Sequence, residues 1–215
     1  MARRVLPVCP NQEELTRARS LYVAYEPRDL FYRAATELVR LAFKNKSSLT
    51  VSEALAVLLQ TWNSQYYRWR GGFGSKDFEA IDEAVKDTQT EILSFRTRCI
   101  STLKEEERNA VARTFTKFDL ALGPVGAAKA LHLLAPDFFP LWDREIAYAY
   151  TINLDRAGLN ASEYFRFMMV TRAMVVQLDS SNESVGILKR IDEYNYCRFT
   201  KNWFVTNKDL KPSRS

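Results

Sequence analysis

Hydrophobic residues recur along most of the chain at the three- and four-residue spacing of an α-helix. The segment 28–43 is typical, because its leucines, phenylalanines and alanines fall on one face of a helix. No stretch shows the sustained alternation of apolar and polar residues that a half-buried strand requires. Only seven glycines and seven prolines interrupt the pattern, and five of the glycines lie in two short loops. The pattern therefore predicts an all-α fold.

Local signals place the ends of the expected helices. Pro27 stands where the first turn of a helix tolerates proline, at the start of the segment 28–43. Thr50 and Glu53 have the spacing of a capping box, in which two side chains satisfy the free N–H groups of a helix start. The same spacing occurs twice later in the chain. The full set of expected helices is 12–25, 28–43, one from Thr50 onward, one long or two consecutive over 75–103, 105–122, a short apolar one after Gly126, 144–152, and two that start at the pairs Asn160–Glu163 and Ser180–Glu183.

Length and composition limit the class of protein. The chain has 215 residues, of which 47% are apolar, so it can bury the core of one large domain or of two small lobes. Segments 1–10 and 206–215 are expected to be tails that flank a single helical domain over 11–205. The net charge of +5 makes a polyanionic partner plausible without deciding for one.

Cysteines and apolar runs narrow the expected environment. Cys9, Cys99 and Cys197 are too far apart for a CxxC metal site and odd in number for a disulfide framework, which favours a reducing compartment. A cluster held by four cysteines is excluded. No apolar run has the length of a signal peptide or approaches the roughly 20 residues of a membrane span. We therefore expect a cytoplasmic protein without a metal or cofactor, and no membrane partner.

An aromatic and basic stretch follows the apolar helix that starts at Thr50. Aromatic rings can stack on unpaired bases, and arginines and amides can contact phosphates and base edges, so the stretch is equipped to hold nucleic acid. Aromatic side chains at a helix end can equally cap the core, with the arginines solvating it. A second mixture of this kind occurs at 194–204 and includes Trp203. The first stretch covers residues 60–70. Its candidate nucleic-acid contacts are Gln60, Trp62, Asn63, Tyr66, Arg68 and Arg70.

The segment 122–150 has the most distinctive organisation. A turn of sequence Gly-Pro-Val-Gly, residues 123–126, opens a short apolar helix that carries Lys129 and His132. A loop bounded by two prolines then leads to Asp143 at the start of another helix. Asp143 can act as the N-cap of that helix or as a catalytic acid, and the two roles are compatible because a cap fixes the carboxylate.

Three parts of the chain together resemble the helix-hairpin-helix DNA glycosylase superfamily. Residues 122–129, LGPVGAAK, are similar to the hairpin of that family, and residues 142–146, WDREI, are similar to the element that carries its catalytic aspartate. Residues 56–63, AVLLQTWN, look like the helix and polar loop that enter the duplex beside the flipped base. The cysteine cluster of some branches is missing, which brings the chain nearer to the cluster-free branches. The resemblance implies a two-lobed domain of about 9–11 helices around one cleft.

The resemblance also implies roles for individual residues. Asp143 would stabilise the positive charge that builds on the sugar as the base leaves, and would activate water. Lys129 would form a Schiff base with the sugar or contact a phosphate; it lies three residues after Gly126, where the family has a spacing of two. Trp142, His132 and Trp203 would line the base pocket. For His132 a buried hydrogen-bonding role is the alternative, and for the two tryptophans it is core packing.

The remaining implied roles concern DNA. Backbone N–H groups of Gly123, Val125 and Gly126 would face a DNA phosphate. Gln60, Trp62 and Asn63 would fill the gap left by the flipped base and read its orphaned partner. Tyr66, Arg68 and Arg70 would contact the DNA backbone.

The sequence thus predicts a monomeric DNA glycosylase that acts on a flipped base in double-stranded DNA. An oxidised purine is one expected substrate, and a bulky modified cytosine of phage DNA, with a role in defence, is another. Two other functions stay open. One is a non-catalytic helix-hairpin-helix module that binds DNA, and the other is an α-helical protein-interaction domain.

Overall fold

The computed structural model describes residues 9–26, 29–62, 67–68, 71–178 and 186–204. This part of the chain contains nine α-helices and no β-strand, so the all-α prediction is confirmed. The helices are α1 (Gln12–Tyr25), α2 (Asp29–Phe43), α3 (Val51–Trp62), α5 (Ser75–Asp87), α6 (Gln89–Arg96), α7 (Arg108–Leu134), α8 (Arg144–Ala149), α9 (Ala161–Leu178) and α10 (Ile187–Asn195). Two 3₁₀ turns (Ile100–Thr102 and Glu105–Glu107) precede α7, and a π-helical turn (Tyr196–Thr200) follows α10.

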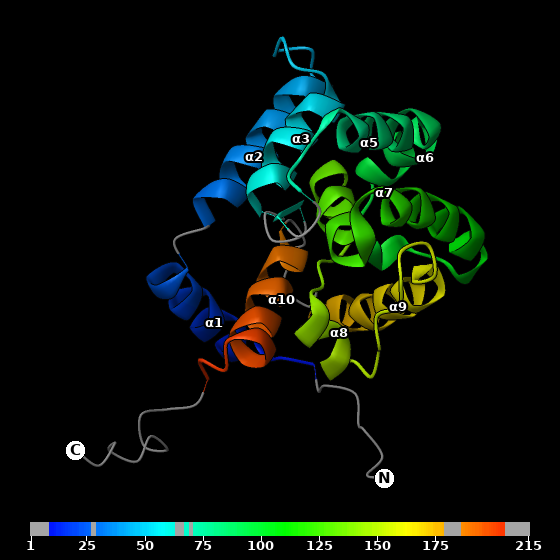
Figure 1. Ribbon diagram of the computed structural model, residues 1–215. Helices are drawn as coiled ribbons and strands as arrows, with labels where there is room; N and C mark the ends of the chain where they lie inside the picture. The colour runs from blue at the N-terminus through cyan, green and yellow to red at the C-terminus, as the bar shows by residue number, and fades with distance from the viewer. Residues whose placement is uncertain (1–8, 27–28, 63–66, 69–70, 179–185, 205–215) are drawn as a thin grey trace.

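Helix α7 is the common partner of five of the other helices. It packs against α2, α3, α5 and α6, and also against α9. Helices α1 and α10 lie side by side next to this group, and α8 contacts the π-helical turn that follows α10 (Figure 1). Within the described residues no helix is both long and apolar enough to cross a bilayer.

One contiguous cluster of buried apolar side chains receives residues from every α-helix named above. Its centre is aromatic: the rings of Phe115 and Tyr164 stack with centroids 4.1 Å apart. The loop between Pro136 and Pro140 contributes Phe138 and Phe139, both fully buried. These two phenylalanines are core anchors, because each is surrounded by other aromatic rings at distances typical of favourable ring pairs.

Helix α7 changes direction at Gly123. The backbone there has φ 70° and ψ 168°, a conformation that side-chain-bearing residues rarely adopt. Pro124 follows and lacks the N–H that would continue the hydrogen-bond ladder. The predicted boundary at Gly123 and Pro124 is therefore confirmed, although a single non-helical residue joins the two helical segments. A helix-hairpin-helix motif in the sense of the family stays a prediction.

The capping predictions have different outcomes. The box at Thr50 and Glu53 forms, since the Thr50 N–H donates to the Glu53 carboxylate at 2.7 Å and the Glu53 N–H donates to the Thr50 hydroxyl at 3.2 Å. Helix α9 starts after Asn160 as expected, but its capping box does not form. Asn160 instead donates through its backbone N–H and its amide to the buried Asp119 carboxylate. The pair Ser180–Glu183 lies outside the described residues.

Helix bounds also depart from expectation in three places. The segment 75–103 forms two consecutive helices that meet at Thr88, one of the two expected arrangements, but the second ends at Arg96. The helix expected from residue 105 begins at Arg108, after a 3₁₀ turn. The helix after Asp143 ends at Ala149 rather than at residue 152. Thr151 adopts a positive φ of 63° just beyond it, which ends the helical conformation.

Candidate functional site

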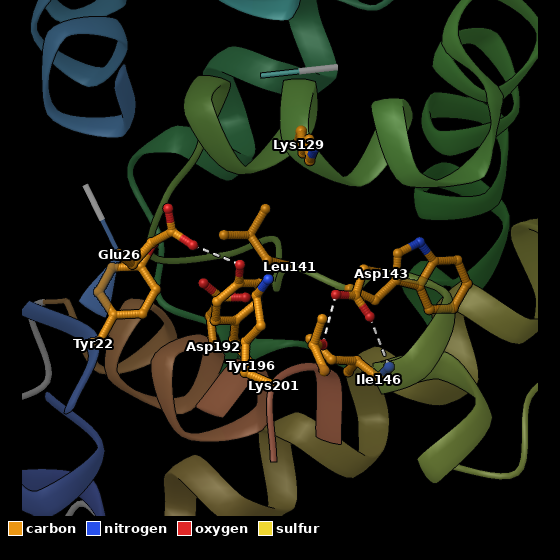
Figure 2. A pocket seen from close by; sticks show the side chains of 11 residues that line it. Tyr22, Glu26, Lys129, Leu141, Asp143, Ile146, Asp192, Tyr196 and Lys201 are labelled. Atoms are coloured by element: carbon orange, nitrogen blue, oxygen red, sulfur yellow. Dashed lines mark hydrogen bonds between the residues drawn. The ribbon is translucent and has the colours of Figure 1, made fainter. Parts of the chain in front are cut away.

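A cavity of about 270 Å³ opens where α1, α7, α8 and α10 meet. It contains Asp143, Lys129 and Trp142, which the sequence analysis singled out. Figure 2 shows Glu26 and Tyr22 on one side, Asp143 on the other, and Asp192 and Tyr196 between them. The complete lining is Tyr22, Glu26, Lys129, Leu141, Trp142, Asp143, Ile146, Asp192, Tyr196, Thr200 and Lys201.

Asp143 is held at both carboxylate oxygens. It is the N-cap residue of α8, and its Oδ1 accepts a hydrogen bond from the Ile146 backbone N–H at 2.8 Å. Its Oδ2 accepts one from the Thr200 hydroxyl at 2.7 Å. A carboxylate can accept about four hydrogen bonds, so capacity remains for a ligand or a water molecule. The capping role is therefore present, and it orients the carboxylate in the cavity.

The π-helical turn after α10 supplies the partner of Asp143. Its wide hydrogen bond runs from the Lys201 N–H to the Tyr196 carbonyl at 2.9 Å. Through this turn, Tyr196 and Thr200 both line the cavity, together with the next residue, Lys201. Single π-helical turns are frequent at functional sites because they redirect side chains within a helix.

Two further carboxylates line the cavity. Asp192 of α10 lies with its Oδ2 3.4 Å from the Lys189 ammonium nitrogen. The pKa of Asp192 is raised, chiefly by burial and further by the charge of Asp143, although the Lys189 ammonium opposes the shift. Glu26, 6% exposed, accepts a hydrogen bond from the Tyr196 hydroxyl at 2.6 Å. Acids from three separate elements thus face one space.

Tyrosine rings form another side of the cavity. Tyr22 and Tyr196 meet edge to face with centroids 5.7 Å apart. Burial, followed by the charges of Asp192 and other acids, raises the pKa of Tyr22, so its phenol keeps its proton at neutral pH. Trp203 does not line the cavity; it packs behind Tyr196 and against Tyr25, at 5.9 and 5.5 Å between centroids.

Trp142 belongs to the core as well as to the cavity. It is 1% exposed and lies against the rings of Phe115 and Tyr164. Its indole N–H donates to the Pro124 carbonyl at 3.0 Å. This hydrogen bond joins the residue before Asp143 to the bend of α7, so the cavity wall and the bend are fixed relative to each other.

His132 is a buried hydrogen-bonding residue and does not line the cavity. Its Nδ1 lies 2.8 Å from the Phe139 carbonyl, which can only accept, so Nδ1 carries the proton. Its Nε2, 3.0 Å from the Tyr32 hydroxyl, accepts from that group. Burial lowers the pKa of His132 to about 4, so the ring is neutral at pH 7. His132 therefore has the buried hydrogen-bonding role that was the alternative, and its place in a base pocket stays a prediction without support from this cavity.

Acid should destabilise the protein through His132. In the unfolded chain His132 takes up a proton near pH 6.5, whereas in the folded chain it does so only near pH 4. The stability from neutral His132 is complete above pH 6.5 and declines as the pH falls towards 4, by about 3 kcal/mol in total. Urea unfolding of the wild type and of His132→Gln at several pH values tests this. The difference between their unfolding free energies should shrink in that window, and a constant difference would contradict the assignment.

The expected DNA-contacting residues are only partly described. Gln60 and Arg68 are exposed, Val125 is half-buried, and Gly123 and Gly126 are buried. Trp62 ends α3, but its side chain lies outside the description, as do Asn63, Tyr66 and Arg70.

One aromatic residue of the same stretch is part of the core. Tyr67 is 2% exposed and packs edge to face on Phe73, with centroids 5.0 Å apart. At this position the core alternative therefore holds.

Among the described residues, no three histidine, cysteine, aspartate or glutamate side chains are placed to hold a metal ion. The cavity offers carboxylates, phenols and two amines.

Comparisons with family models, with curated proteins and with solved structures give no match for this chain.

The sequence pointed to Lys129, Trp142 and Asp143 but not to the other residues that line the cavity. Glu26, Asp192 and Thr200 carry no motif of their own. The spacing of Lys189, Asp192 and Glu193 does predict ion pairs along α10, at three and four residues. It does not tell whether that face meets solvent or a cavity, which only the packing of α1 on α10 decides.

Proposed function

We propose that the protein is a DNA glycosylase that takes a damaged or modified base into the cavity and hydrolyses its N-glycosidic bond. The proposal rests on the position of the Asp143 carboxylate. Its carboxylate is fixed by Ile146 and Thr200 and lies in a cavity shared with Lys129. The resemblance of residues 122–129 and 142–146 to the glycosylase superfamily supports the same reading.

The chemistry needs an anion at the sugar. As the base leaves, positive charge develops at the anomeric carbon, and a preorganised carboxylate stabilises it without having to reorient. The same carboxylate can take a proton from the water that attacks this carbon. The departing base carries the bonding electrons and is protonated, and an abasic site remains in the strand.

The cavity is small and carries a positive charge at its edge. At about 270 Å³ it lies slightly below the range of about 300–1,000 Å³ typical of small-molecule sites. The exposed Lys201 lies at this cavity, where it can meet a phosphate of the strand. The net charge of +5 favours approach to a polyanion.

A substrate panel tests the proposal. Purified protein is incubated with duplexes that contain uracil, 8-oxoguanine, alkylated bases or modified cytosines, and with natural phage DNAs. Abasic sites are scored by alkali cleavage and released bases by mass spectrometry. We expect the release of one class of base. Salt-sensitive binding without any release would instead indicate a non-catalytic DNA-binding module, and absence of binding would indicate a protein-interaction domain.

Lys129 should contribute to DNA binding more than to base release. It is half-buried at the cavity, and its charge can meet a phosphate. Lys129→Gln is expected to lower the slope of log affinity against log salt concentration by about one, and to weaken binding for all sequences alike. Fluorescence anisotropy with a labelled duplex at several salt concentrations measures this. Strand breaks that appear before alkali with the wild type and vanish in Lys129→Gln would assign a Schiff-base role instead.

A further inference from the structure

Two of the cavity's three carboxylates have no part in the step assigned to Asp143. Asp192 comes from α10 and Glu26 from the end of α1; Figure 2 shows Glu26 across the cavity from Asp143, with Asp192 between them. If the sugar lies at Asp143, these two acids lie where the base would be. Their chemistry therefore bears on which base is accepted.

Asp192 is held in place by a caged cation. The ammonium nitrogen of Lys189 lies 3.4 Å from Asp192 and 3.5 Å from Glu193. It also lies 4.2 Å from the ring centroid of Tyr22 and 4.6 Å from that of Tyr32. Burial alone would lower the pKa of Lys189, but the carboxylates of Asp192 and Glu193 outweigh it and the pKa is raised. The lysine thus stays charged and orients Asp192.

Glu193 points away from the cavity and completes this arrangement. Its side chain is 1% exposed and forms an ion pair with Arg19 in addition to the one with Lys189. Two cations and two carboxylates therefore balance one another behind the cavity wall. Only Asp192 of the four lines the cavity.

We propose that Asp192 and Glu26 form an acceptor edge that selects bases with an exocyclic amino group on the edge that enters the cavity. The inference rests on the proposed function and names its substrate class: bases with this amino group are accepted, and analogues with a carbonyl or a hydrogen at that position are rejected. Asp192 is a specificity-determining residue in this scheme, and Lys189 is a positioning residue.

The physical reason begins with the Lys189 ammonium, which lies 3.4 Å from Asp192 and favours its ionised form against the burial of the site. An ionised carboxylate only accepts hydrogen bonds. An amino group that faces Asp192 and Glu26 donates hydrogen bonds to them. A carbonyl in the same place would bring one acceptor against another and leave the carboxylates and the carbonyl without a donor. Two hydroxyl donors of the cavity are already engaged, since Tyr196 donates to Glu26 and Thr200 donates to Asp143. Sites built to bond a donor discriminate strongly against ligands that lack it.

Two pairs of closely related substrate bases test the selectivity. 5-Hydroxymethylcytosine and 5-hydroxymethyluracil differ only at the amino-bearing edge, and 8-oxoguanine and 8-oxohypoxanthine differ only in the 2-amino group. For whichever pair is processed, the wild type should release the amino-bearing member at least about tenfold faster. Asp192→Asn, which can donate as well as accept, should bring the two rates together. Equal rates for the wild type, or faster release of the member that lacks the amino group, would overturn the inference.

Glu193→Gln is the matched control. It removes the other carboxylate of Lys189 without altering the cavity lining. If Asp192 acts only by neutralising Lys189, the two variants should change selectivity alike. If Asp192 reads the base, only Asp192→Asn should.

Binding of free bases separates this inference from the proposed activity. Saturation-transfer NMR compares cytosine with uracil and 2-aminopurine with purine, for the wild type and Asp192→Asn. Amino-bearing bases that bind the wild type selectively, without any release from DNA, would uphold the acceptor edge and remove the glycosylase. If neither binding nor release is selective, the acceptor edge is wrong.

Discussion

Asp143→Asn should reduce base release by at least about a hundredfold and leave the fold intact. Asparagine loses the negative charge that stabilises the cationic sugar, and it is a poor base towards water. Its side-chain oxygen can still accept from the Ile146 N–H, and its amide can donate to the Thr200 hydroxyl, so both existing contacts have a replacement. Asparagine caps helices about as well as aspartate, so the unfolding free energy should change by less than about 0.5 kcal/mol.

Single-turnover release from the substrate found with the panel measures the catalytic effect, and urea unfolding measures the stability. Glu145→Gln is the control, because it removes the same charge from the first turn of α8 at an exposed position. It should leave release unchanged. If Asp143 is only an N-cap, Asp143→Ala lowers the unfolding free energy by about 1 kcal/mol and Asp143→Asn has no effect on release. That result would remove the catalytic assignment.

The sequence predicted those features of the fold that depend on interactions between residues close together in the chain. The capping box of Thr50 and Glu53, the bend at Gly123 and the helix start at Asp143 each depend on residues within about one helical turn. These features followed from residue type and spacing. The all-α fold followed from the spacing of apolar residues for the same reason.

Long-range contacts decided the rest. Asn160 has the sequence context of a cap, but Asp119, 41 residues earlier, takes its hydrogen bonds because a buried carboxylate without donors costs more than an unfilled cap. The partner of Asp143 is Thr200, 57 residues away, and no spacing rule connects them. The cavity was therefore predictable on the side of α7 and α8 and unpredictable on the side of α1 and α10.

Trp142 combines a position that local sequence signals predicted with long-range contacts that they did not. The sequence placed it beside Asp143, and its long-range contacts determine what it does there. Its indole packs among Phe115, Tyr164 and Phe167 while its N–H reaches the bend of α7. A loss of this side chain should therefore affect stability first and the cavity second.

Trp142→Ala is expected to lower the unfolding free energy by about 3–5 kcal/mol, since it leaves a cavity among aromatic rings that cannot all relax. Trp142→Phe keeps most of the apolar contact and loses only the bond to Pro124, so it should cost about 1–2 kcal/mol. Urea unfolding of the three proteins measures both values. Base release by the phenylalanine variant then separates the two roles: an unchanged rate means that Trp142 acts as core, whereas a large fall in rate at nearly full stability means that its indole holds the α7 bend and Asp143 in the geometry that the reaction needs.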